Sequence, residues 1–180
     1  MEMIYAGTGS VRTPHWVRDL FCIAGERLAE SFTLRSGRQD GSDISFERGC
    51  EKGHGKTEIW LPWQHYNYSK SNKVVNVDKY RYICASAYSD WDNLSVAMKK
   101  EYARCVPMIL GEDLDKPVDF MICYIPPDED DTVSRFAYSL ANTNNIPIMN
   151  VGIYYEHESV YVYDSIIALA EKVKRKYNDI

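Results

Sequence analysis

The segment that most constrains the fold is Val118–Ile125, which is nearly all apolar and stops at Pro126 and Pro127. An unbroken apolar run is typical of a strand inside a parallel sheet, where helices cover both faces. Shorter runs of the same kind lie at Met3–Ala6, Phe32–Arg35, Thr57–Leu61 and Ile146–Val151. We therefore expect Val118–Ile125 to be an inner strand of a parallel sheet.

Apolar residues at helical spacing separate these expected strands. The spacing predicts helices that start at Thr13-Pro14, at Ser42 and at Asp92, and further helices over Val133–Ala141 and Tyr163–Tyr177. Strands that alternate with helices fold into a parallel sheet with helices on both faces. The pattern predicts an α/β fold, a Rossmann-like three-layer sandwich with a mostly parallel central sheet, formed by residues 1–180 as one domain.

Residues 63–90 form the longest stretch without a clear period, and they are rich in Tyr, Asn, Ser and Lys. A stretch of this length inside a domain is usually an inserted lobe or a binding loop. We expect an irregular insertion at about 63–90, and both interpretations stay open.

The charge balance limits the partners that the chain can bind. Its 21 Lys and Arg residues and 26 Asp and Glu residues give a formal net charge of −5. Binding to nucleic acid or to an acidic membrane surface requires a basic face, and no dense Lys/Arg run supplies one. Neither a membrane nor a nucleic acid is an expected partner.

The cysteine pattern argues against disulfides and metal ions. The five cysteines are widely spaced, and none forms a C-x-x-C pair. Cys50 and His54 lie four residues apart, but no further ligand type lies close to them, so we expect no metal site. We also expect no cofactor.

The N-terminal residues already resemble a strand and not a leader, which predicts a cytoplasmic protein.

In a sheet of this type, ligands bind beyond the carboxyl ends of the strands. The first turn at this edge contains Gly7, Thr8, Gly9, Ser10 and Arg12. Glycines let the backbone approach a ligand, and the helix that follows offers free N–H groups to an anion. Arg12 replaces the third glycine of the dinucleotide fingerprint. We therefore expect Arg12 to pair with a phosphate or carboxylate, the alternative being an ordinary tight turn.

The second turn contains Ser36, Gly37, Asp40 and Asp43, and Glu47 follows one helical turn after Asp43. Carboxylates at a helix start can cap its N–H groups, which is the structural explanation of Asp40 and Asp43. The functional interpretation is that a carboxylate accepts hydrogen bonds from sugar hydroxyls while Ser36 and the backbone face a phosphate. Asp43 and Glu47 are spaced to point the same way.

The third turn is the acidic run 128–131, followed by Thr132 and Arg135 on the next expected helix. Adjacent carboxylates repel a phosphate, so we expect the run to start the helix. Thr132 and Arg135 are the residues of this turn that we expect to approach a ligand.

These turns resemble motifs of the SLOG superfamily. Ala6–Ser10 with Thr13-Pro14 is similar to its A-G-x-G-S-R-x-T-P opening. Leu34–Gly37, followed by Asp40, Gly41, Asp43, Phe46 and Glu47, resembles its L-R-S-G-G-A-x-G-A-D-x-A-F-E segment. Looser likenesses continue through Ala103-Arg104, Leu110-Gly111, Pro117–Phe120 and Ile146–Asn150. The superfamily includes the DNA-processing protein DprA, the LOG phosphoribohydrolases and short phage and bacterial proteins regarded as nucleotide-binding.

The resemblance implies a protein that binds a nucleotide or a nucleotide-derived small molecule. The implied ligand-binding residues are Gly7, Thr8, Gly9, Ser10, Arg12, Ser36, Gly37, Asp40, Asp43, Thr132 and Arg135. One biological version is a phage anti-defence protein that sequesters a signalling nucleotide in the host cytoplasm. We also expect a homo-oligomer.

The departures from the family pattern favour binding over hydrolysis. Arg135 stands where LOG enzymes place a catalytic Glu, and the acidic run replaces their phosphate loop. Cleavage of an N-glycosidic bond needs a carboxylate near the developing oxocarbenium ion. One alternative is a nucleotide N-glycosidase or phosphoribohydrolase that uses Asp40, Asp43 and Glu47. The other is a DprA-like protein that binds single-stranded DNA, which the net charge disfavours.

Overall fold

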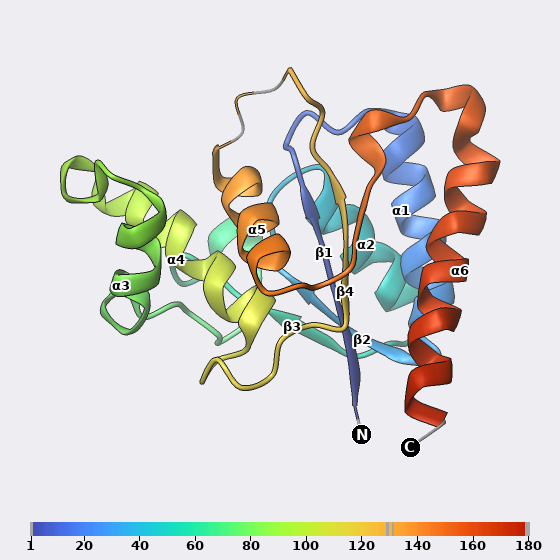
Figure 1. Ribbon diagram of the computed structural model, residues 1–180, viewed down its shortest axis with the longest axis horizontal. Helices are drawn as coiled ribbons and strands as arrows, with labels where there is room; N and C mark the ends of the chain where they lie inside the picture. The colour runs from blue at the N-terminus through green and yellow to red at the C-terminus, as the bar shows by residue number, and fades with distance from the viewer. Residues whose placement is uncertain (1, 129, 131, 179–180) are drawn as a thin grey trace.

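The computed structural model describes residues 2–128, 130 and 132–178, and its centre is a five-stranded parallel sheet (Figure 1). The strand order is β3-β2-β1-β4-β5. The strands are β1 (Met3–Gly9), β2 (Phe32–Ser36), β3 (Thr57–Ile59), β4 (Phe120–Tyr124) and β5 (Ile148–Asn150). All four neighbouring pairs are parallel, which confirms the predicted α/β class and the Rossmann-like sheet.

Helices cover both faces of the sheet and complete the three layers (Figure 1). One face carries α1 (His15–Leu28), α2 (Ser42–Lys52) and α6 (Ser159–Asn178). The other carries α4 (Val96–Leu110) and α5 (Thr132–Thr143), and α3 (Val77–Ala87) packs on α4 away from the sheet. The described residues also form the short 3₁₀ turns η1 (Tyr66–Tyr68), η2 (Trp91–Asn93), η3 (Val151–Ile153) and η4 (Glu156–Glu158).

Alternate side chains of each inner strand fill separate cores on the two faces, as the two-residue period of a strand requires. On the α1/α2/α6 face, the ring of Tyr5 stacks on Phe120 with 5.6 Å between centroids, and Phe32 meets Phe120 edge-on at 5.2 Å. On the α4/α5 face, Met121 and Cys123 are fully buried. Because β4 lies between β1 and β5, the sequence-based prediction of an inner strand over this apolar run is confirmed.

Helix α1 starts close to the predicted Thr13-Pro14, but Thr13 does not cap it. The N-cap residue is Pro14, and no side chain caps the helix. The Thr13 hydroxyl instead donates to the Ser10 carbonyl oxygen at 2.5 Å and lies 2.7 Å from Ser42 Oγ. A tertiary contact between two turns therefore replaces the local cap.

Two later segments also differ from the sequence prediction. Helix α4 starts at Val96 and not near Asp92, because Ser95 caps it by accepting a hydrogen bond from Met98 N at 3.2 Å. Residues 63–90, expected to be irregular, contain the eleven-residue helix α3. Only Tyr80 and Cys84 of α3 are buried, so its apolar stripe is too narrow to stand out in the sequence.

Within the described residues, no helix is long and apolar enough to span a membrane.

We predict that Phe120→Asp abolishes soluble expression. The Phe120 side chain is fully buried between two aromatic rings, and an unpaired carboxylate there costs several kcal/mol, a large part of the 5–15 kcal/mol that typically stabilises a domain. Soluble yield and thermal melting followed by circular dichroism measure the effect, with Phe120→Leu as the apolar control. A cooperatively folding Phe120→Asp variant would remove β4 from the core.

Candidate ligand-binding site at the carboxyl end of β2

The turns that follow β1, β2 and β4 meet at the carboxyl edge of the sheet. Ser10 N donates to the Tyr124 carbonyl oxygen at 3.0 Å, which ties the first turn to β4. Gly41 has a φ of +90°, and a Cβ atom on it would lie 2.4 Å from the Ser10 carbonyl oxygen. The first and second turns are therefore packed directly against each other, and position 41 requires glycine.

The glycines of the first turn accommodate protein atoms. A Cβ atom on Gly7 would lie 2.6 Å from the ring of Phe46, and one on Gly9 would lie 2.6 Å from both Ser42 Oγ and the Tyr124 carbonyl oxygen. Thr8 and Ser10 are buried with them. The structure thus explains both glycines through packing of the sheet against α2. Arg12 is exposed beside this turn, and its contact with a ligand stays a prediction.

In the second turn, Glu47 is held through both of its carboxylate oxygens. Oε1 accepts a hydrogen bond from Ser36 Oγ at 2.6 Å, and Oε2 forms an ion pair with Arg38 at 2.5 Å. Burial raises the pKa of Glu47, while the contacts with Ser36 and Arg38 oppose the rise. The side chain expected to be a candidate catalytic group thus already has a structural role.

Asp43 lies in the first turn of α2 and points back toward β2. Its Oδ2 accepts a hydrogen bond from Gly37 N at 2.8 Å. Its Oδ1 is buried and has no hydrogen-bond partner in the part of the chain that the structure describes, and only 1% of the residue is exposed. Burial raises the pKa of Asp43 to about 7, with Glu47 adding to the rise and Arg104 opposing it. The carboxyl therefore titrates near neutral pH.

Arg104 reaches this turn from α4, on the opposite face of the sheet. It donates to the Gly37 carbonyl oxygen and to Gln39 Oε1 (2.8 Å), and it pairs with Glu101 at 2.7 Å. Only 2% of Arg104 is exposed. Its guanidinium carbon lies 5.1 Å from the centre of the Tyr66 ring, within range of a cation–π interaction. Arg104 thus fixes both the second turn and the segment after β3.

Arg104 was not among the site residues predicted from the sequence. It lies in the stretch Tyr102–Ile109, in which every residue is buried. An arginine inside such an apolar stretch is a usable signal, because a buried guanidinium requires partners.

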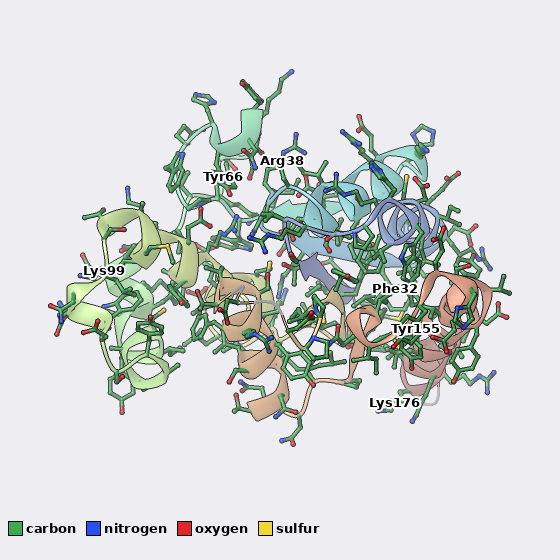
Figure 2. All side chains as sticks on the ribbon, turned by 90° about the horizontal axis from the view of Figure 1, so that it is seen from above. Phe32, Arg38, Tyr66, Lys99, Tyr155 and Lys176 are labelled. Atoms are coloured by element: carbon green, nitrogen blue, oxygen red, sulfur yellow. The ribbon has the colours of Figure 1, made fainter. Side chains whose placement is uncertain are left out.

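A hollow of about 380 Å³ opens beside the second turn, between α2 and the segment after β3. We call it the β2 pocket. Its lining comprises Arg38, Asp40, Ile44, Glu47, Arg48, Glu51, Asn67 and Tyr68. Arg38 and Asn67 close one side through reciprocal hydrogen bonds, Arg38 Nε to the Asn67 carbonyl oxygen at 3.3 Å and Asn67 Nδ2 to the Arg38 carbonyl oxygen at 2.9 Å. Figure 2 shows Arg38 and Tyr66 close together at one margin of the molecule.

The lining brings together only part of the predicted site. Asp40 and Glu47 line the β2 pocket, whereas Ser36, Gly37 and Asp43 are buried and do not line it. Arg38, Arg48, Asn67 and Tyr68 line it without having been predicted. Asn67 and Tyr68 come from the stretch 63–90, whose two open interpretations included a binding loop.

The third turn is held by its own contacts. Arg135 Nη2 donates to the carbonyl oxygens of Pro126 and Pro127, at 3.1 and 3.0 Å. Thr132, at the start of α5, is exposed. Residues 129 and 131 of the acidic run lie outside the described residues.

Among the described residues, no group of three His, Cys, Asp or Glu side chains is placed to hold a metal ion. Comparison of the chain with family models, curated proteins and solved structures found no match. The function must therefore be inferred from the site itself.

We predict that Asp43 makes the protein less stable as the pH rises through 7. Its pKa is about 7 in the fold and 3.8 in a free chain, so the native state holds a proton that the unfolded state has released. The stabilising contribution is complete below pH 3.8 and is lost as the pH rises to about 8, by up to about 4 kcal/mol. Denaturant unfolding from pH 4.5 to 8.5 measures this loss.

Asp43→Asn is the matched variant for this measurement, because it keeps the shape and removes the titration. Its unfolding free energy is expected to vary less with pH than that of the wild type. Identical pH profiles for the wild type and Asp43→Asn would contradict the buried, near-neutral carboxyl.

Proposed function

We propose that this protein binds a nucleotide or nucleotide-derived small molecule in the β2 pocket and does not turn it over. The proposal rests on the position of this pocket at the carboxyl end of β2 in a Rossmann-like sheet, where such folds usually bind their ligands. Its volume of about 380 Å³ falls within the range typical of small-ligand sites.

The lining offers a recognition group for each part of a nucleotide. The exposed carboxylate of Asp40 can accept hydrogen bonds from ribose hydroxyls. Arg48, also exposed, supplies guanidinium N–H donors for oxygen atoms of the ligand, and Tyr68 presents an aromatic face to a base. The combination of these three groups favours a nucleotide over a purely apolar ligand.

The state of the carboxylates favours binding over hydrolysis. Both oxygens of Glu47 are engaged by Ser36 and Arg38, and Asp43 is buried behind the turn. A glycosidase needs carboxyl groups that face the scissile bond from the pocket. Asp40 is the candidate catalytic carboxylate that is both exposed and part of the lining.

One observation supports the alternative of a nucleotide N-glycosidase. Asp43 carries a pKa of about 7 and an oxygen, Oδ1, without a hydrogen-bond partner among the described residues. A carboxyl that titrates near neutral pH is suited to general acid–base catalysis. This alternative requires the second turn to open, because Oδ1 is shielded from solvent in the present structure.

The biological role that we propose for the binder is the capture of a signalling nucleotide, as in a phage anti-defence protein. This role rests on the SLOG-like motifs of the first two turns. DNA binding is the less favoured function, because the formal net charge is −5.

If the protein binds its ligand without hydrolysing it, the ligand is released chemically intact. Excess protein is incubated with each of the four ribonucleoside 5′-monophosphates, binding is measured by equilibrium dialysis, and the ligand is recovered after heat denaturation and identified by mass spectrometry. Unchanged nucleotide is the expected product. Free base or ribose phosphate that forms at a rate proportional to protein concentration would establish the hydrolase instead.

Arg48 is expected to contribute to this binding. Arg48→Ala should weaken the affinity by roughly 1.5–3 kcal/mol, the usual contribution of a hydrogen bond to a charged group. Arg27→Ala is the matched control, because Arg27 lies in the last turn of α1 and pairs with Glu30. Calorimetry that gives equal affinities for the wild type and Arg48→Ala would move the ligand out of the β2 pocket.

A further inference from the structure

A second hollow, of about 510 Å³, adjoins the β2 pocket along α2 and β3. We call it the lysine pocket. Its lining comprises Arg38, Glu51, Thr57, Ile59, Tyr68, Ser69, Lys70, Ser71, Asn72 and Lys73. Arg38, Glu51 and Tyr68 line both hollows, so the two lie side by side, and we call them together the groove.

The two ends of the groove carry opposite charge. The lysine pocket holds the cations of Arg38, Lys70 and Lys73 against a single carboxylate, Glu51. The β2 pocket holds three carboxylates against the guanidinium groups of Arg38 and Arg48. A ligand that carries hydroxyl groups at one end and an anion at the other matches this gradient.

The cationic end is built on an ordered segment. Lys73 Nζ lies 5.0 Å from the centre of the Trp60 ring, and the main chain at Leu61 and Val75 is joined by a hydrogen bond of 2.9 Å. Ser71 Oγ donates to the Ile59 carbonyl oxygen at 2.6 Å and accepts from Lys73 N at 3.2 Å. These contacts fix the segment 69–75 beside β3, which limits the ordering cost when its lysines bind an anion.

Tyr68 stands at the junction of the two pockets with its ring in solvent. Its exposed fraction is 97%, which is unusual for a large aromatic side chain. The backbone is left-handed at His65, Asn67 and Tyr68, with φ values of 62°, 44° and 58°. Such conformations are strained in residues other than glycine and persist only where the surroundings enforce them. Here the Arg38–Asn67 hydrogen bonds do so.

We propose that the lysine pocket is a phosphate-binding subsite, and that the ligand is a phosphorylated nucleoside whose base stacks on Tyr68. Its phosphate lies against Lys70 and Lys73, and its ribose hydroxyls lie toward Asp40 in the β2 pocket. This inference rests on the proposed function and adds the orientation of the ligand and the requirement for a phosphate.

The test compares each nucleoside with its 5′-monophosphate, using adenosine, guanosine, cytidine and uridine. In calorimetry, the monophosphate of the best-binding pair is expected to bind about tenfold more tightly than the nucleoside. The double variant Lys70→Ala/Lys73→Ala should remove this difference and leave nucleoside affinity unchanged. Lys172→Ala/Lys176→Ala, which removes the same charge from α6, should keep it; Lys176 lies far from Arg38 in Figure 2.

Tyr68→Leu should weaken the nucleoside and its monophosphate by the same factor, because it removes the stacking face and leaves the lysines in place. A phosphate preference that survives in Lys70→Ala/Lys73→Ala, or its absence from the wild type, would overturn the subsite and leave the proposed function standing. Failure of all eight compounds to bind the wild type would overturn the proposed function itself.

Discussion

The site depends on a buried arginine that joins the two helical layers across the end of the sheet. Arg104 extends from α4 to the carbonyl oxygen of Gly37, at the end of β2. Burying a guanidinium is expensive unless its donors find acceptors, and Glu101 and Gln39 supply two more. Removing one partner from such a group generally costs more than the pair contributes, so the second turn has little freedom to move.

The shape of the groove follows from this anchor. With Gly37 held, Arg38 adopts a left-handed conformation (φ 62°), and its side chain pairs with Glu47 while its carbonyl oxygen accepts from Asn67. The exposed ring of Tyr68 is thereby placed between an acidic and a basic hollow. The proposed ligand would thus lie beside β2 and β3. A glycine turn after β1, such as the one at Gly7 and Gly9, would instead suggest a ligand at the end of β1.

The strands were predictable because their signal is local. The run at 118–125 needed no tertiary information to be assigned to the interior of a parallel sheet. The proximity of Asp43 and Glu47 was also predictable, since residues four apart share a helix face, and the effect of Glu47 on the pKa of Asp43 is consistent with this. What Gly7 and Gly9 accommodate was not predictable, because the atoms beside them belong to Phe46, Ser42 and Tyr124.

The rest of the site could not be read from the sequence because its contacts are distant along the chain. Arg104 meets Gly37 across 67 positions, and Asn67 meets Arg38 across 29. No periodicity links such residues. The segment 63–75 has no regular pattern because its structure comes from side-chain anchors and left-handed residues, and not from a repeated backbone geometry.

Mapping amide chemical shifts while nucleoside 5′-monophosphates are titrated into the protein tests whether the ligand lies along α2 and β3. The groove predicts shifts concentrated in residues 37–51 and 66–73, with the amides of 7–12 and 132–135 unaffected. Shifts confined to 7–12 and 132–135 would place the ligand at the ends of β1 and β4 and would rule out binding in the groove.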